Sequence, residues 1–214
     1  MSPPIKNGLY AITDCDNLSF EMVLNKTRLI LDAGIAALQY RDKFSAAKFR
    51  LDRARALQKL CSQYGVPFLI NDDIRIAKQI DADGVHIGRD DPGYQESRAI
   101  LGEKIIIGVS CYNSLPDAMT AQRMGADYIA FGSFFPTESK KNSVKASPDL
   151  ITAAKKKLFI PIVAIGGITV ENGKPLLEAG ADMLACISSL YASDAPQQVV
   201  FRFNKLFAET VRVS

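Results

Sequence analysis

Donor side chains alternate along one short segment, Gln39-Tyr40-Arg41-Asp42-Lys43. In an extended strand, residues two apart point to the same side, so Gln39, Arg41 and Lys43 would share a face. One amide, one guanidinium and one ammonium suit a multiply charged anion such as a diphosphate, because arginine offers a planar fork and lysine a mobile point charge. The same residues are equally compatible with a strand end that opens into a solvated loop.

Two pairs of aspartates come after neighbouring apolar runs: Asp72 and Asp73, which follow Asn71, and Asp90 and Asp91. One or two carboxylates together with substrate phosphates are the usual way in which Mg²⁺ is held. Two structural roles compete, because Asp73 precedes a helical pattern and can cap it, while Asp90 precedes a proline and can begin a turn. We expect one aspartate of each pair to serve the backbone and the other to bind metal.

A second anion site is indicated near the end of the chain. Gly166 and Gly167 follow one apolar run, and Ser188 follows Ile187 at the end of the next. Paired glycines let backbone amides approach an anion, and a serine adds a hydroxyl donor. A helix is expected to start at about Val170, and a tight turn without a ligand is the competing interpretation.

Three further features bear on chemistry. Residues 134–141 form a loop rich in hydroxyl and lysine side chains that has room to fold over a ligand, or that simply lies on the surface. Ser110, just past another apolar run, adds one polar group. His86 is the only histidine and lies on an apolar strand, so we expect a hydrogen-bonded core residue rather than a catalyst.

These polar segments lie at the ends of short runs rich in β-branched or aromatic residues, which alternate with amphipathic helical segments such as Ala46–Tyr64 and Leu115–Met124. The eight expected strands are Leu9–Thr13, Ala37–Arg41, Phe68–Asn71, Gly84–Ile87, Ile105–Val109, Tyr128–Gly132, Ile162–Ile165 and Met183–Ile187. The alternation is typical of βαβ units in a parallel sheet.

A doubly wound open sheet and a closed (β/α)₈ TIM barrel both satisfy this α/β pattern. Eight units within 214 residues, without a linker-like stretch, favour the barrel and one domain over residues 1–214. In such a barrel the C-terminal strand ends meet at one mouth, so the polar segments would share a site.

Composition narrows the class of protein. The net charge is only +3 and no basic stripe appears, so we expect no nucleic-acid partner. The apolar stretches are too short to span a bilayer and the first ten residues lack a signal-peptide pattern, so we expect no membrane partner and a cytoplasmic location. The four cysteines form no metal or disulfide pattern. The oligomeric state stays open, and a homodimer is among the arrangements that the sequence allows.

In order along the chain, the motifs are Gln-x-Arg-x-Lys, Asn-Asp, Gly-x-x-Asp, Gly-Val-Ser, Phe-Pro-Thr-x-Ser-Lys, Ile-Gly-Gly-Ile and Ile-Ser. This ordered set resembles the thiamin phosphate synthase family, also called thiamin phosphate pyrophosphorylase, whose members are (β/α)₈ barrels. The resemblance runs from Leu9 to Ser188. Each motif is weak alone, whereas their common order is specific.

The resemblance implies an enzyme that condenses hydroxymethylpyrimidine diphosphate with a thiazole phosphate and releases pyrophosphate. It implies that the pyrimidine diphosphate is bound by Gln39, Arg41, Lys43, Asn71, Ser110 and Lys140. It implies that Mg²⁺ is held by Asp72 and Asp91, and that the thiazole phosphate is bound by Thr137, Ser139, Gly167, Ile187 and Ser188. We expect Tyr40, Asp42 and Glu138, within the same segments, to contribute to substrate binding, and Arg41, Lys43, Ser110 and Lys140 to act in catalysis.

The family mechanism is dissociative: diphosphate departs first, and the thiazole nitrogen captures the resulting pyrimidine methyl cation. Such chemistry needs cationic donors and positioning rather than a protein nucleophile, in agreement with a chain that holds one histidine. The chain departs from many relatives at Tyr112, where they carry histidine, and at Arg89. Two rivals stay open, a thiazole tautomerase-like paralogue and a catalytically silent barrel that binds a phosphorylated ligand.

Overall fold

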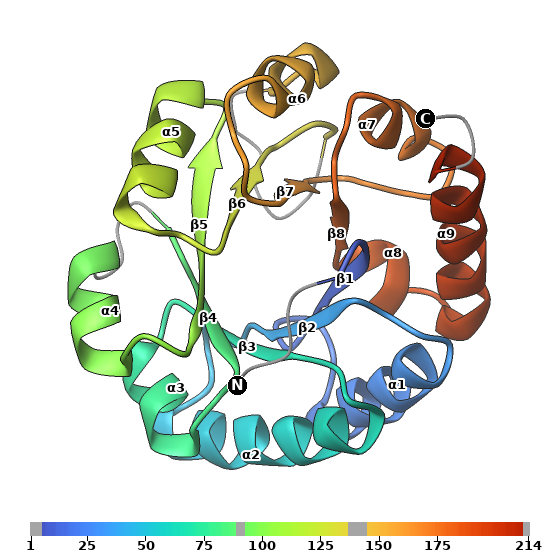
Figure 1. Cartoon of the computed structure of the whole chain (residues 1–214). Helices are drawn as coiled ribbons and strands as arrows, with labels where there is room; N and C mark the ends of the chain where they lie inside the picture. Colours follow the sequence, from blue (N-terminus) through green and yellow to red (C-terminus); the bar gives the residue numbers. More distant parts are fainter. Residues whose placement is uncertain (1–5, 89–92, 137–144, 212–214) are drawn as a thin grey trace.

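The computed structural model describes residues 6–88, 93–136 and 145–211, which form a ring of parallel strands surrounded by helices (Figure 1). The strands are β1 (Gly8–Ile12), β2 (Ala37–Tyr40), β3 (Phe68–Asn71), β4 (Gly84–Ile87), β5 (Ile106–Tyr112), β6 (Tyr128–Phe131), β7 (Ile162–Ile165) and β8 (Met183–Cys186). The helices are α1 (Phe20–Asp32), α2 (Ala47–Tyr64), α3 (Ile74–Ile80), α4 (Tyr94–Leu101), α5 (Leu115–Met124), α6 (Pro148–Lys155), α7 (Lys174–Glu178), α8 (Ser188–Tyr191) and α9 (Pro196–Val211).

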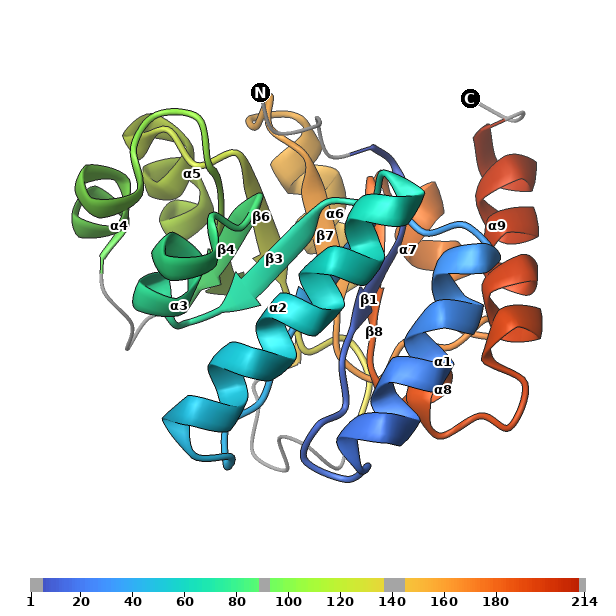
Figure 2. The ribbon, with the colours of Figure 1, turned by 90° about the horizontal axis from the view of Figure 1, so that it is seen from below.

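The sheet is closed. Each strand pairs with the next in parallel, and β1 also pairs with β8, with Gly8 opposite Met183 and Ala11 opposite Cys186. This closure confirms the barrel and excludes the open doubly wound sheet. Figure 2 shows the barrel from the side. The start of β1 and the end of α9 lie at one end of the barrel, and the C-terminal ends of the strands lie at the other.

Local sequence signals explain where several helices begin and end. The side chains of Ser19 and Ser114 accept hydrogen bonds from backbone amides in the first turns of α1 and α5. Gly65 ends α2 in the left-handed conformation, with φ of 64°, where glycine has no Cβ to clash. No helix of the described residues is long and apolar enough to cross a bilayer.

The core has two parts because side chains alternate along each strand. One part fills the barrel and includes Tyr10, Leu69, Tyr128 and Val163. The larger part lies between the barrel and the helices. The inward rows also carry polar side chains toward the strand ends, and these reach the site described below.

Most expected elements match the structure, with small shifts at their ends. Strands β3, β4 and β7 have the expected bounds, and α2 starts at Ala47 instead of Ala46. Two expectations are wrong. Ser110 lies within β5 rather than past it, because β5 continues to Tyr112 through an irregular register. The helix after β7 starts at Lys174 rather than about Val170.

The delayed start of α7 has a clear cause in the loop before it. The side chain of Asn172 accepts a hydrogen bond from the amide of Thr169 and donates one to the carbonyl of Gly167, both within 2.9 Å. Asn172 thereby closes a turn on its own backbone, which replaces the helical pattern at these residues.

Candidate active site at the barrel mouth

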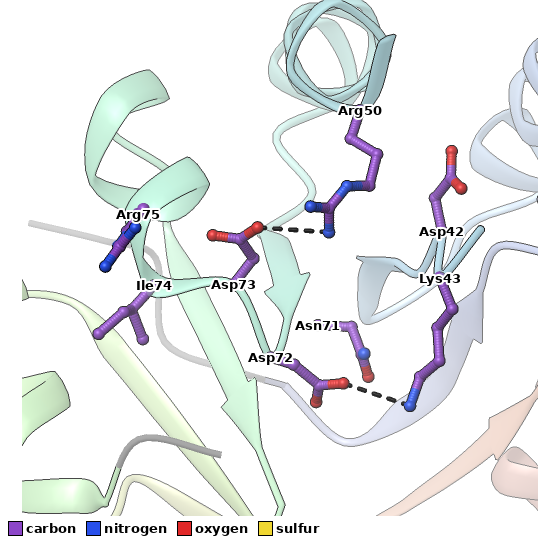
Figure 3. Close-up of a pocket in the computed structure, with 8 residues that line it drawn as sticks. All are labelled: Asp42, Lys43, Arg50, Asn71, Asp72, Asp73, Ile74 and Arg75. Carbon is purple, nitrogen blue, oxygen red and sulfur yellow. Dashed lines mark ion pairs between the residues drawn. The ribbon is translucent and has the colours of Figure 1, made fainter. Parts of the chain in front are cut away.

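A pocket of about 470 Å³ opens where β2 and β3 end, beside the first turns of α2 and α3. Its lining residues are Asp42, Lys43, Arg50, Asn71, Asp72, Asp73, Ile74 and Arg75, drawn as sticks in Figure 3. Charged side chains of both signs therefore gather at the C-terminal ends of neighbouring strands, which is where sites form in such barrels.

Lys43 and Asp72 face each other across this pocket (Figure 3). Their charged atoms, Nζ and Oδ2, are 3.4 Å apart, and the side chains are 49% and 31% exposed. Asn71 lies beside them. The structure thus brings together one residue expected to bind diphosphate, one expected to bind metal, and an amide from the same strand end.

The backbone at Asp72 explains how its carboxylate reaches the pocket. Asp72 has φ of 65°, a left-handed conformation that aspartate adopts more readily than most residues. Its amide donates to the carbonyl of His86 at 2.9 Å, and the next amide, of Asp73, donates back to the carbonyl of Asn71 at 2.8 Å. This sharp turn separates two adjacent aspartates, sending one to the pocket and the other to the helix.

Asp73 is the helix cap that the sequence predicted. Its Oδ1 accepts a hydrogen bond from the amide of Ile76 at 3.1 Å, and its Oδ2 pairs with Arg50 at 3.3 Å. Arg50 and Arg75, which also line the pocket, were not predicted as site residues. They could have been found, because the first turns of helices that follow strands β2 and β3 must lie at the mouth.

Arg41 lies next to the pocket and is held by residues from the segment after β1. Its guanidinium contacts the carboxylate of Asp16, and its amide donates to the hydroxyl of Thr13 at 2.9 Å. Asp16 also accepts a hydrogen bond from the amide of Lys43 at 3.4 Å. Asp16 was not predicted as a site residue. It binds the side chain of Arg41 and the backbone amide of Lys43, which were both predicted.

Gln39 and Tyr40, the two residues of the donor segment that lie on β2, point to opposite faces of the sheet. Gln39 points into the barrel and is 3% exposed, whereas Tyr40 points outward and stacks on Phe68 between the barrel and the helices. Because β2 ends at Tyr40, the alternation stops there and the chain enters a loop. Gln39 therefore points inward as expected, whereas Arg41 and Lys43 lie beyond β2 at the mouth, where strand alternation no longer decides their direction. Their shared face with Gln39 stays a prediction.

The carboxylate of Asp42 is directed to a structural cluster. It accepts hydrogen bonds from the hydroxyl of Tyr40 at 3.0 Å, from Arg53 at 2.9 Å and from the amide of Ser45 at 3.0 Å. Burial by itself would raise the pKa of Asp42, but these hydrogen bonds hold that pKa below its usual value. The structure does not direct Tyr40 or this carboxylate toward Lys43 and Asp72.

At the second expected anion site, the paired glycines have a packing role as well as the expected role of letting an anion approach the backbone. Gly166 and Gly167 have φ of 105° and 64°, and a Cβ at Gly167 would lie 2.4 Å from the carbonyl oxygen of Pro136. The two glycines therefore let the loop after β6 pack closely against the end of β7. Ile187 is partly buried and Ser188, the first residue of α8, is exposed at the end of the neighbouring strand β8.

Five expected site residues lie outside the described residues: Asp91, Thr137, Glu138, Ser139 and Lys140. The same holds for Asp90, expected in a turn, and for Arg89, a departure from the family pattern. Their expected roles stay predictions. Among the described residues no three histidine, cysteine, aspartate or glutamate side chains cluster as a metal site. Asp72 supplies one partly exposed carboxylate at the mouth, which fits one ligand of a Mg²⁺ ion whose other ligands include substrate phosphates.

The four cysteines are free thiols. Burial raises the pKa of Cys111 and of Cys186 to about 12, and it raises the pKa of Cys61 as well. These thiols stay protonated near neutral pH and are poor nucleophiles. The charged and amide side chains of the mouth, rather than a thiolate, are therefore the groups available for chemistry in the described part of the chain.

A family model for thiamine monophosphate synthase matches residues 9–190. The thiamine-phosphate synthase of Azoarcus sp. (strain BH72) is 45% identical over 201 residues, covering 94% of this chain and 97% of that protein. The thiamine-phosphate synthase of Nitrosococcus oceani is 47% identical over 193 residues, covering 90% of this chain and 88% of that protein.

Solved structures give the same similarity. Thiamine phosphate pyrophosphorylase from Pyrococcus furiosus superposes with a TM-score of 0.86 at 30% identity, covering 97% of this chain and 98% of that one. Orotidine 5'-phosphate decarboxylase from Pyrococcus horikoshii superposes with a TM-score of 0.69 at 15% identity, over 92% of this chain and 99% of that one, which indicates a shared fold alone.

Proposed function

Since the chain belongs to the thiamine monophosphate synthase family, we propose that its barrel mouth joins hydroxymethylpyrimidine diphosphate to thiazole phosphate. The products are thiamin phosphate and pyrophosphate. One observation supports this assignment above the others: Lys43, Asn71 and Asp72 converge on one pocket, with the ammonium 3.4 Å from the carboxylate. A diphosphate ester that binds a divalent cation needs both kinds of charge side by side.

In this proposal the cations of the mouth bind the leaving group. Lys43 and Arg41 donate to the diphosphate oxygens, and Ser110 donates its hydroxyl from within β5. Asp72 and Asp91 hold Mg²⁺, which when bound acts as a Lewis acid on the departing diphosphate. Lys140 reaches the same group from the segment after β6. The protonated thiols agree with a reaction in which no protein nucleophile attacks.

The thiazole phosphate is proposed to bind at the ends of β7 and β8. Gly167, Ile187 and Ser188 offer backbone amides and one exposed hydroxyl there, and Thr137 and Ser139 complete the set. The two rings would then meet over the centre of the mouth, where holding them in line lowers the entropy cost of the step. Tyr40, Asp42 and Glu138 belong to the proposed binding segments as positioning residues.

The partners in this proposal are these two small molecules. We propose a cytoplasmic location, with which four free and mostly buried cysteines are compatible. A homodimer stays a prediction, which the mass of the purified protein in solution would test.

One assay tests the function. Purified protein is mixed with both substrates and Mg²⁺, and thiamin phosphate and pyrophosphate are followed by mass. We expect both products with Mg²⁺ and their loss on adding a chelator. Product from folded protein in chelator would contradict the metal assignment, and no product in any condition would favour the tautomerase-like or silent alternatives.

The neighbouring aspartates provide a matched pair of variants for the same assay. Asp72→Asn should slow turnover by roughly a hundredfold, because it removes a metal ligand while asparagine still accepts the left-handed backbone. Asp73→Asn keeps the helix cap and should leave turnover within about twofold of the unmodified enzyme. Equal effects of the two substitutions would contradict the assignment of Asp72 to the metal.

A further inference from the structure

A chain of hydrogen bonds crosses the inside of the barrel below the mouth. It joins two residues that the proposed function assigns to the substrate, Gln39 on β2 and Ser110 on β5, through three buried side chains. The links run Gln39 to Tyr10, Tyr10 to Tyr128, Tyr128 to His86 Nδ1, and His86 Nε2 to Ser110, each at 2.9 Å. The four residues from Gln39 to His86 are at most 8% exposed.

Gly108 on β5 provides the space that the ring of Tyr128 occupies in this chain of hydrogen bonds. A Cβ on Gly108 would lie 1.9 Å from Cζ of Tyr128, so the tyrosine ring occupies the space that a side chain on β5 would fill. Tyr128 stacks on His86 with ring centroids 5.6 Å apart and meets Tyr10 edge to face at 6.0 Å. These contacts fix the rings, so the hydrogen bonds have little freedom to rearrange.

One direction of the chain gives every buried hydroxyl proton an acceptor. Gln39 donates its amide to the oxygen of Tyr10, and Tyr128 then accepts the hydroxyl proton of Tyr10; in the reverse direction the fully buried Tyr10 proton has no acceptor among the hydrogen bonds of the described residues. The proton of Tyr128 then goes to Nδ1 of His86, which must accept it. A neutral ring that accepts at Nδ1 carries its proton on Nε2 and donates it to the oxygen of Ser110.

The tyrosines can play this part because they keep their protons. Burial raises the pKa of Tyr10 to about 12 and raises the pKa of Tyr128 well above its usual value. Each hydroxyl therefore donates one hydrogen bond at neutral pH. Breaking any link would leave a buried polar group without its partner, which costs more than the bond contributes when made.

We propose that His86 is a positioning residue, held as the Nε2–H tautomer by Tyr128, and that it orients Ser110 so that the serine hydroxyl proton is offered to the pyrimidine diphosphate. Ser110 accepts from His86, which leaves its own proton for the ligand. The role assigned to Ser110 rests on the proposed function, whereas the tautomer of His86 follows from the hydrogen-bond chain alone.

The tautomer is tested without any substrate. His86 is the only histidine of the chain, so nitrogen-15 labelling of histidine in tag-free protein yields one ring in the NMR spectrum. We expect the proton on Nε2 and a bare Nδ1 in the unmodified protein. A proton on Nδ1, or on both nitrogens, at neutral pH would overturn the proposal, because the chain would then run in another direction.

The kcat values of variants test whether His86 orients Ser110. Tyr128→Phe keeps the ring and removes the donor to Nδ1, so we expect kcat to fall about tenfold. His86→Gln keeps donor and acceptor atoms and should retain more activity than His86→Leu. In Ser110→Ala, adding His86→Leu should cause no further fall in kcat, because the residue through which His86 acts is already gone. A full additional loss in the double variant would overturn the proposal.

A matched control separates this role from general stability. Thr27 and Tyr191 share a fully buried hydroxyl pair at 2.8 Å outside the barrel chain, so Thr27→Val deletes one buried hydrogen bond, where Tyr128→Phe deletes two. We expect Thr27→Val to lower the melting temperature, by less than Tyr128→Phe does, and to leave kcat unchanged. A kcat of Tyr128→Phe equal to that of Thr27→Val would overturn the inference. Absence of product from the unmodified enzyme would instead contradict the proposed function and leave the NMR result valid.

Discussion

The charged residues of the mouth are already paired within the chain, and the strength of each pair decides whether it can be exchanged for a ligand. Lys43 and Asp72 are half-exposed at 3.4 Å, and such pairs contribute at most about 1 kcal/mol. Binding a phosphate oxygen in place of that carboxylate therefore costs little. Asp42 is different, because Arg53, Tyr40 and Ser45 all bind its buried carboxylate. We therefore regard Lys43 as free to change partners and Asp42 as fixed.

The fixed character of Asp42 predicts a pH-dependent stability. Its folded pKa lies below the unfolded value of about 3.9, so its contribution is present above about pH 4 and is lost as the pH falls through the folded pKa. Asp42→Asn should lower the free energy of unfolding by about 2 kcal/mol at pH 7. Denaturant unfolding at several pH values should show this difference shrinking below about pH 4.

The exposed Asp52 on α2 is the control for that measurement. Asp52→Asn should change the free energy of unfolding by less than about 0.5 kcal/mol at every pH. A difference between Asp42→Asn and the unmodified protein that stays constant into acid would mean that the carboxylate is not held as the structure shows.

The positions of single residues could be predicted from the sequence where neighbouring residues along the chain decide them. Asp73 was predicted as a cap because the helical pattern starts at the next residue, and Asn71 and Asp72 were placed at the mouth because a buried strand precedes them. Asp16 escaped prediction because its contact with Arg41 spans 25 residues and depends on the pairing of β1 with β2. The outward position of Tyr40 follows from strand alternation, whereas the end of β2 at Tyr40, which leaves Arg41 and Lys43 in a loop, does not.

At the scale of elements, the loop after β6 and the turn after β7 form one packed unit. The amides of Phe134 and Phe135 donate to the carbonyls of Ile165 and Gly166, at 3.3 and 3.0 Å. Paired glycines suggested an anion site, and the structure gives them a packing role that the sequence could not show, because the partner loop is about 30 residues away. These two hydrogen bonds hold the described start of the loop against the end of β7, where we propose that the thiazole phosphate binds.

Substituting two glycines that have the same φ angle would measure how tightly the loop after β6 packs against the end of β7. Gly65 and Gly167 both have φ of 64°, but a Cβ at Gly65 meets nothing within 4 Å, while one at Gly167 would lie 2.4 Å from the Pro136 carbonyl. Gly65→Ala should cost about 1 kcal/mol of stability from backbone strain alone. Gly167→Ala should cost at least about 2 kcal/mol more, because the loop must move. Thermal and denaturant unfolding give both values, and equal costs would show that the loop after β6 does not press on Gly167.

At the scale of the whole molecule, closure of the barrel is the feature on which the site depends. The order of strands follows from the alternating pattern, and β1 to β8 could be placed along the chain within one or two residues of their ends except for the longer β5. No local pattern encodes the pairing of β1 with β8, because it joins residues about 175 apart. The number of units predicted closure, and the side chains that complete it became visible only in the structure.

One such side chain is Asn204 on α9, which joins the last unit to the first. Its Nδ2 donates to the carbonyls of Ala33 and Gly34 after α1, at 3.0 and 2.9 Å, across 170 residues of chain. Gln58 on α2 makes the same kind of contact locally, donating to the carbonyls of Ile80 and Asp81 at the C-terminal end of α3 at 2.9 and 3.0 Å, across about 22 residues. Asn204 and Gln58 thus make similar contacts, but the contacts of Asn204 join segments much farther apart in the sequence.

We expect Asn204→Ala and Gln58→Ala each to lower the free energy of unfolding by about 1 to 2 kcal/mol, because each removes two hydrogen bonds to helix-end carbonyls. Their kinetics should differ. Contacts between distant segments carry the larger loop-closure entropy and form late, so Asn204→Ala should mainly speed unfolding, whereas Gln58→Ala should mainly slow refolding. Stopped-flow folding and unfolding rates in denaturant would measure both effects. If Asn204→Ala slows refolding as much as Gln58→Ala does, the first and last units are already joined in the transition state, and closure of the barrel precedes the completion of its local units.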